Sequence, residues 1–224
     1  MNRDVDVRDI SDGRFYTAND LVKADTGGCD GCSECCRSMV DTIILDPWDI
    51  YMLNKNTGMN FTALMEQGFL ELNVTDGLIL PNLKVSGRTK ACPFLDENGR
   101  CRVHEARPGF CRLFPLGRYY ENRDFRYILQ THECAKKNLT KVKVKKWLGI
   151  ENLGAYENYI RGWHFYLRDT ESMLKDSREQ LRRQVCIYIV KTFFVADYNI
   201  REDFYAQFAA RLQEGRRYCG FAEK

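Results

Sequence analysis

Short apolar runs separated by turn residues dominate the first part of the 224-residue chain. Residues 40–45 are rich in β-branched side chains, and residues 70–85 alternate between apolar and polar positions around turns at Asp76-Gly77 and Pro81-Asn82. Runs of this kind predict strands. We therefore expect one strand or extended segment at 40–45 and two or three short strands within 70–85.

Helices are predicted among these strands by capping residues. Asp46 followed by Pro47 is typical of a helix start with proline at the first helical position, and it predicts a helix over residues 48–55 that Gly58 ends. Asn60 predicts a second short helix directly after it. Further along, two apolar runs within residues 116–129 flank a polar tetrapeptide and predict a β-hairpin.

The pattern becomes helical after residue 140. Apolar residues recur there mostly at intervals of three or four, which is the period of an amphipathic helix. They form three series: Leu153, Tyr156, Ile160, Trp163, Leu167 and Leu174; Leu181, Val185, Tyr188 and Val195; and Ile200, Phe204, Phe208 and Leu212. This pattern predicts three amphipathic helices, after a short one, that pack as a bundle.

Together these elements indicate an α+β protein that is mostly helical. We expect a mostly extended lead-in over residues 1–26 and a cysteine-rich half with short strands over residues 27–138. A C-terminal helical unit over residues 139–224 is expected to pack on that half. No low-complexity linker separates the two.

Composition narrows the classes of function. Thirty-four Lys and Arg against 31 Asp and Glu leave a net charge of +3, which gives no electrostatic basis for general nucleic-acid binding. No stretch approaches the roughly 20 apolar residues of a membrane span, and the N-terminal residues lack the apolar core of a signal peptide. We therefore expect a cytoplasmic protein that binds neither nucleic acid nor membranes. In that reducing compartment, ten cysteines indicate metal binding or catalysis in preference to disulfides.

The densest chemical signal is the segment Cys-Asp-Gly-Cys-Ser-Glu-Cys-Cys at residues 29–36. Cys29, Cys32 and Cys35 recur at intervals of three, as do three ligands of the four-iron clusters in bacterial ferredoxins. Cys36 directly follows Cys35, so its side chain leaves in a different direction and suits a second site or a bridge. Thiolates are soft ligands that select zinc or iron–sulfur clusters.

A second block contributes four more cysteines: Cys92, Cys101, Cys111 and Cys134. A tight turn at Asn98-Gly99 is expected to bring Cys92 and Cys101 together. Three arginines near this block are candidates to offset the negative charge of a four-thiolate centre: Arg107, Arg112 and Arg118. The alternative for Arg107 and Arg112 is that they form salt bridges or pack over aromatic rings.

Eight thiols can form two four-cysteine sites, one site with bystanders, or one larger cluster. With two sites, the first takes Cys29, Cys32 and Cys35 with one remote cysteine, and the second takes Cys36 with three of Cys92, Cys101, Cys111 and Cys134. Structural zinc usually shows two separated C-x2-C pairs, and only the first block has one, so the spacing favours a 4Fe–4S centre slightly over Zn2+. His132 is either a substitute ligand or a histidine beside the site. Cys186 and Cys219 stand apart from both blocks, and we exclude them.

Three enzymatic motifs are incomplete or absent. Cys32-x3-Cys36 begins the C-x3-C-x2-C motif of radical S-adenosylmethionine enzymes, but the third position is Met39. A Rossmann-type methyltransferase would need a glycine-rich loop after a strand, and none is found. A thioredoxin-like dithiol at Cys29 and Cys32 lacks the surrounding βαβ pattern.

The cysteine blocks, with Cys92-Pro-Phe-Leu and Arg107-Pro108-x2-Cys111-Arg112-x-Phe114-Pro115, resemble the YkgJ family, also called the CxxCxxCC zinc- or iron-chelating domain. The resemblance covers about residues 25–135, and the chain departs from the family at His104, where members more often carry an aromatic residue. It implies a metal-binding protein without a defined biological role. Flagellin lysine-N-methylase is the branch with a named reaction, and it implies the alternative of a protein lysine N-methyltransferase.

We therefore expect a metal-binding protein with a cysteine-ligated centre, iron–sulfur or zinc, that is structural or carries electrons. Its partner is the metal ion or cluster, joined by a protein substrate under the methyltransferase alternative. An interaction scaffold built on the helical half is a third hypothesis. The sequence leaves open whether the chain is an enzyme, and it leaves open the oligomeric state.

Overall fold

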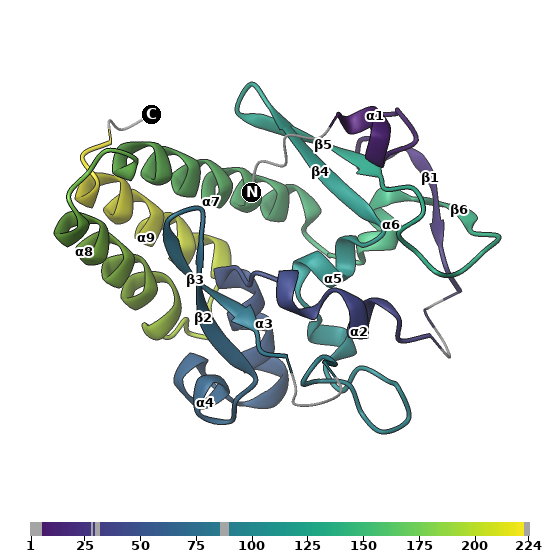
Figure 1. Ribbon diagram of the computed structural model, residues 1–224, viewed down its shortest axis with the longest axis horizontal. Helices are drawn as coiled ribbons and strands as arrows, with labels where there is room; N and C mark the ends of the chain where they lie inside the picture. The colour runs from purple at the N-terminus through teal and green to yellow at the C-terminus, as the bar shows by residue number, and fades with distance from the viewer. Residues whose placement is uncertain (1–5, 28, 30–31, 86–89, 222–224) are drawn as a thin grey trace.

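The computed structural model describes residues 6–27, 29, 32–85 and 90–221. About 45% of the described residues are helical and about 19% lie in strands, which confirms an α+β protein that is mostly helical. Figure 1 shows the long C-terminal helices on one side of the molecule, with the short strand pairs and short helices arranged beside them.

The first part of the chain consists of short elements. Its helices are α1 (Val7–Ile10), α2 (Cys35–Ser38), α3 (Pro47–Thr57), α4 (Phe61–Glu66) and α5 (Gly109–Leu113), with 3-10 turns η1 (Val40–Thr42) and η3 (His104–Ala106). Its strands form three separate antiparallel pairs: β1 (Leu21–Asp25) with β6 (Thr140–Lys143), β2 (Leu70–Thr75) with β3 (Leu78–Leu83), and β4 (Leu116–Glu121) with β5 (Asp124–Leu129). A two-stranded pair is only marginally stable alone, so each depends on the helices and loops that cover it.

The C-terminal part is helical, as predicted. It contains α6 (Val144–Leu148), α7 (Leu153–Leu174), α8 (Glu179–Val190), which continues into the π-helical turn η4 (Lys191–Val195), and α9 (Phe204–Tyr218). The third amphipathic helix begins at Phe204 and not at Ile200, because the Asp203 carboxylate caps it by accepting from the Ala206 N–H at 2.7 Å. None of the described helices has both the length and the apolar character of a membrane span.

The predicted helix caps are confirmed. Asp46 accepts a hydrogen bond from the Asp49 N–H at 3.0 Å and Pro47 opens α3. Gly58, at φ +72°, ends this helix in the left-handed conformation that glycine adopts without strain. Asn60 accepts from the backbone N–H of the third residue of α4 at 3.0 Å. These short-range signals fixed the position of both helices.

The prediction of a strand or extended segment over residues 40–45 is only partly right. Residues 40–42 form the 3-10 turn η1. Residues 43–45 pair with β3, because Ile44 bridges Asn82, the Leu45 N–H donates to the Pro81 carbonyl at 2.8 Å, and the Ile43 carbonyl accepts from the Leu83 N–H at 3.1 Å. The prediction of a turn at Pro81-Asn82 is wrong, because both residues lie within β3, which pairs with β2. The Pro81 carbonyl accepts from the Leu45 N–H and therefore faces away from β2. The nitrogen of a strand residue faces the same side as its carbonyl, so the N–H that proline lacks removes no hydrogen bond between β2 and β3.

The expectation of helix from residue 140 onward is also wrong for residues 140–143. These residues form β6, whose partner β1 lies more than a hundred residues earlier in the chain. Four residues carry too little periodicity to separate a strand from a helix, so only the remote partner decided the outcome.

One hydrophobic core extends through both parts of the chain. The ring centroids of Trp48 in α3 and Tyr156 in α7 lie 5.0 Å apart. The backbone N–H of Trp48 donates to the Tyr159 hydroxyl at 3.0 Å. Tyr51 contacts Phe204 of α9 at 5.1 Å between ring centroids. The helix α3 therefore anchors the cysteine-rich part on the C-terminal helices, while the division at residues 26 and 138 stays a prediction.

Candidate metal centre

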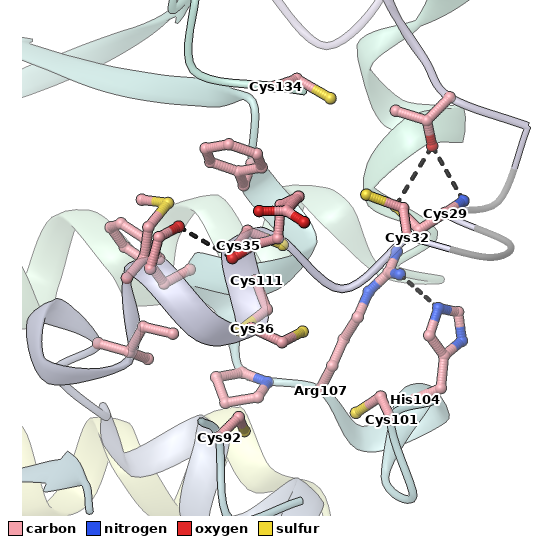
Figure 2. A pocket seen from close by; sticks show the side chains of 18 of the residues that line it. Cys29, Cys32, Cys35, Cys36, Cys92, Cys101, His104, Arg107, Cys111 and Cys134 are labelled. Carbon is pink, nitrogen blue, oxygen red and sulfur yellow. Dashed lines mark hydrogen bonds between the residues drawn. The ribbon is translucent and has the colours of Figure 1, made fainter. Parts of the chain in front are cut away.

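A cavity of about 380 Å³ lies between α2, α5 and the loops that carry the second cysteine block. All eight clustered cysteines line it: Cys29, Cys32, Cys35, Cys36, Cys92, Cys101, Cys111 and Cys134. Figure 2 shows these side chains distributed around the cavity wall. The fold thus brings together the two blocks that the sequence separates.

Backbone hydrogen bonds fix one block against the other. The Cys92 N–H donates to the Cys36 carbonyl at 2.8 Å. The loop that follows Cys92 is folded by Asp96, whose Oδ1 accepts from the Asn98 N–H at 2.9 Å. Gly99 takes a left-handed φ of +74°, so the predicted turn at Asn98-Gly99 is formed.

Cys111 lies on α5, a short helix whose first residue is held by α3. The Gly109 N–H donates to Asp49 Oδ1 at 2.7 Å, and the Asp49 side chain is buried. A Cβ atom at Gly109 would overlap the Tyr156 hydroxyl of α7. The position of Cys111 therefore depends on packing between three helices.

The inner thiols perturb one another. A hydrogen bond from Cys36 lowers the pKa of Cys35 to about 7, and the same contact raises the pKa of Cys36 above its ordinary value. Burial raises the pKa of Cys92 to about 11, and burial also raises the pKa values of Cys101 and Cys111. Because thiolate is the form that binds metals, cation binding here must displace protons.

Of the three candidate arginines, Arg107 lines the cavity. Its Nη1 lies 2.7 Å from His104 Nε2, and His104 lines the cavity as well. The guanidinium charge contributes to the lowered pKa of Cys35 and opposes the rise in the pKa of Cys101. Arg107 is therefore placed to offset negative charge on the thiolates.

Arg112 and Arg118 make other contacts and do not belong to the described lining of the cavity. Arg112 donates to the Glu105 carbonyl and lies over the Trp48 ring, 5.6 Å from its centroid. Arg118 donates to the Tyr156 hydroxyl at 3.1 Å. Arg112 thus matches the alternative prediction of packing over an aromatic ring, and Arg118 likewise lies over the Phe125 and Tyr156 rings, 5.6 and 5.7 Å from their centroids.

The described side chains around the cavity do not converge on one point. Among the described residues, no three His, Cys, Asp or Glu side chains are close enough together to hold a single ion. Tetrahedral zinc needs four ligands at one atom, with sulfurs about 2.3 Å from it. The eight thiols are soft ligands, and in their chemistry they fit zinc or iron.

Residues 28–143 match the model of the CxxCxxCC family, which is described as "Putative zinc- or iron-chelating domain". The chain belongs to the CxxCxxCC family. The match covers just over half of the chain and includes all eight clustered cysteines. It confirms the resemblance drawn from the motifs, while the relation to flagellin lysine-N-methylase stays a prediction. Comparisons with curated proteins and with solved structures found no match.

Membership of the CxxCxxCC family supports metal binding, by zinc or iron, and does not separate an iron–sulfur cluster from zinc. The other candidates from the sequence lie elsewhere. His132 is exposed and is absent from the described lining, although Cys134 is part of it. Cys186 is buried in α8, and the Cys219 sulfur lies 3.7 Å from the Tyr166 hydroxyl.

Several residues of this CxxCxxCC cavity were not predicted from the sequence. Thr26 Oγ1 lies 3.3 Å from the Cys29 sulfur and accepts from the Cys29 N–H at 3.1 Å. Lys136 donates to the Thr26 carbonyl at 3.5 Å. The apolar wall includes Phe94, Phe110 and Phe114. All lie within three residues of a cysteine, but only the folded loops determine which neighbours face the cavity.

Proposed function

We propose that this chain is an iron–sulfur protein in which the eight clustered cysteines form two cluster sites within one cavity. The supporting observation is that eight thiols from both blocks line this cavity while no three of them converge within the described residues. A zinc ion would draw four sulfurs to about 2.3 Å from one atom. An iron–sulfur cluster places iron and inorganic sulfide between the thiolates, so it joins thiols that lie further apart.

We assign one site to Cys29, Cys32, Cys35 and Cys134, and the other to Cys36, Cys92, Cys101 and Cys111. The second group is supported by the backbone hydrogen bond between the Cys92 N–H and the Cys36 carbonyl, which holds the second cysteine block against Cys36. The first group is supported by the contact of Lys136 with Thr26, which joins the loop after Cys134 to the loop before Cys29.

The centre is expected to stabilise the cysteine-rich part of the fold or to carry electrons. Metal binding in cysteine sites supplies on the order of 10 kcal/mol of folding free energy. All ten cysteines are free thiols, which suits a reducing compartment such as the cytoplasm. We further propose that residues 27–138 form the metal-organised unit, preceded by the lead-in at 1–26 and followed by the helical unit at 139–224.

The test is anaerobic purification followed by measurement of iron, zinc and acid-labile sulfide, with an absorption spectrum of the same sample. Two 4Fe–4S sites predict a brown protein with about eight irons and eight sulfides per chain. A colourless protein with zinc and no sulfide would refute the iron–sulfur proposal and leave the cavity as a zinc site.

Single substitutions test the division into two sites. Cys134→Ala and Cys111→Ala should each remove about half of the iron, because each is expected to disable a different four-iron site. Cys186→Ala is the matched control, since this buried cysteine lies outside the cavity, and it should leave the iron content unchanged. Loss of all iron from either cavity variant would contradict two independent sites.

A further inference from the structure

The paired strands β1 and β6 present lysines to solvent. Val22 of β1 is buried, whereas its neighbours Leu21 and Lys23 are exposed. In the antiparallel register, Lys23 lies opposite Lys141 and Leu21 lies opposite Lys143. Residues directly opposite each other share one face of the pair, so these three lysines project from the same side.

Two lysines directly opposite each other are an unfavourable pair. Their Cβ atoms are about 5 Å apart in this geometry, and like charges so placed destabilise the strands. Within the described part of the chain, neither Lys23 nor Lys141 forms an ion pair that would relieve the repulsion. A local charge conflict without a structural gain is a feature expected at functional surfaces.

Neighbouring segments extend this charge. From Cys134 to Ile150 the chain carries six lysines and neither Asp nor Glu. Asp20 and Asp25, at the two ends of β1, accept hydrogen bonds from backbone N–H groups of their own loops. The exposed lysines of β1, β6, α6 and the loop before β6 together form what we name the lysine surface: Lys23, Lys137, Lys141, Lys143, Lys145 and Lys146.

The lysine surface is continuous with the cysteine cavity. The chain leaving β1 reaches Thr26 and Cys29, and the chain entering β6 comes from Cys134 and Lys136; all four residues line the cavity. Figure 1 shows β1 and β6 side by side at the edge of the molecule. A molecule that covers the lysine surface would therefore lie next to the cavity.

We propose that the lysine surface docks an acidic protein and holds it beside the cysteine cavity. This inference rests on the proposed function, because it supplies the kind of partner that the metal centre would meet. Complementary charge accelerates encounter and orients the partner, even where each exposed ion pair adds little affinity.

The composition of the surface favours a protein over a nucleic acid or a membrane. Its cations are all lysines, and residues 127–160 contain no arginine, the side chain that grips phosphate in bidentate fashion. Trp147 is half-buried against the core and its indole N–H donates to the Leu113 carbonyl at 3.3 Å, so only part of its ring is open to base stacking. Leu21 is the one large apolar side chain exposed on the described residues of β1, β6 and α6, which is too little to anchor in a bilayer.

The test measures the binding of a fluorescein-labelled oligoglutamate peptide to the metal-loaded 224-residue chain by fluorescence anisotropy at low ionic strength. Lys23→Glu combined with Lys141→Glu should weaken binding about tenfold. The matched control, Lys55→Glu combined with Lys191→Glu, makes the same charge change on exposed lysines outside the surface and should change binding less than about twofold.

The single variant Lys23→Glu separates docking from folding. It should weaken peptide binding and yet raise Tm, because it replaces the Lys23–Lys141 repulsion with an attraction. Equal weakening by the two double variants, or no peptide binding by the wild-type chain, would overturn the proposal. Tighter binding of a single-stranded oligonucleotide or of phosphatidylserine vesicles than of the peptide would also overturn it.

Iron and sulfide measured in the same samples distinguish failure of the two proposals. A wild-type chain without iron would refute the proposed centre, whatever the peptide does. Iron retained in the Lys23→Glu, Lys141→Glu variant together with weakened peptide binding would support the lysine surface, and iron retained with unchanged binding would refute that surface alone.

Discussion

Asp49 joins two elements of the fold through its carboxylate. Oδ2 accepts from the Asp46 N–H at 2.9 Å and completes the capping box of α3, while Oδ1 accepts from the Gly109 N–H at 2.7 Å and holds the start of α5. The side chain is only 1% exposed, so water cannot replace either bond. We predict that Asp49→Ala lowers the free energy of unfolding by about 2–4 kcal/mol.

This magnitude follows from the two donors left behind. Each buried N–H that loses its acceptor costs about 1–3 kcal/mol. Part of this loss is offset, because burial and the nearby charge of Asp46 raise the pKa of Asp49 well above its ordinary value and make its ionised form unfavourable. Asp49→Asn keeps the shape but has a single acceptor oxygen, so we expect it to cost about 1–2 kcal/mol.

The free energy of unfolding of both variants is measured by urea unfolding of the metal-loaded chain and is compared with that of a matched control variant. Asp203 caps α9 from an exposed position, where it accepts from the Ala206 N–H, and Asp203→Ala should cost about 1 kcal/mol. Asp49→Ala should also lower the iron content, because Cys111 lies on the helix that Asp49 holds. A cost for Asp49→Ala no greater than that of Asp203→Ala would refute the reasoning.

Three further predictions concern packing, protonation and thiol reactivity. Gly109→Ala should destabilise the fold by roughly 2 kcal/mol or more through overlap with α7. Gly154→Ala, where an added Cβ would meet nothing within 4 Å apart from its chain neighbours and the backbone of its own helix, should be neutral or stabilising in thermal unfolding. Burial lowers the pKa of His164 to about 4, so the unfolded chain binds a proton that the folded chain does not, and stability is lost as pH falls from about 6.5 towards 4. His164→Phe should therefore reduce the loss of stability between about pH 7 and pH 5 by about 1 kcal/mol in urea unfolding, and an unchanged loss would contradict this account. In the metal-free chain Cys35, with its pKa of about 7, should be alkylated first at neutral pH as measured by mass spectrometry, and Cys36→Ala should slow its reaction; first modification of another thiol would argue against the Cys36 hydrogen bond.

Local chemistry allowed much of the fold to be predicted from the sequence. Asp46-Pro47, Gly58 and Asn60 determine helix ends through hydrogen bonds and dihedral preferences that involve residues within one turn. The long series of apolar residues at helical intervals in α7 likewise specifies a helix and its buried face. Such signals can be recognised in the sequence without knowledge of the segment against which the helix packs.

The sequence-based predictions failed where a segment distant in the sequence determines the local structure. Residues 40–45 have β propensity, yet local hydrogen bonds close η1 at residues 40–42, and only residues 43–45 pair with β3. The strand β6 exists because β1 pairs with it, and Pro81 continues β3 because its missing N–H faces away from β2. In each case the outcome depends on which side of the backbone a neighbour occupies, and a single sequence does not encode that locally.

The sequence by itself indicated the chemistry of the candidate centre, because Cys29-x2-Cys32-x2-Cys35-Cys36 and the second block supply eight thiols, which are soft metal ligands whatever the fold. Only the tertiary structure decided that both blocks line one cavity, that Arg107 faces this cavity while Arg118 does not, and that Lys23 lies opposite Lys141. The physical reason is that ligand identity belongs to each side chain, whereas proximity depends on the packing of helices and strand pairs that are distant in sequence.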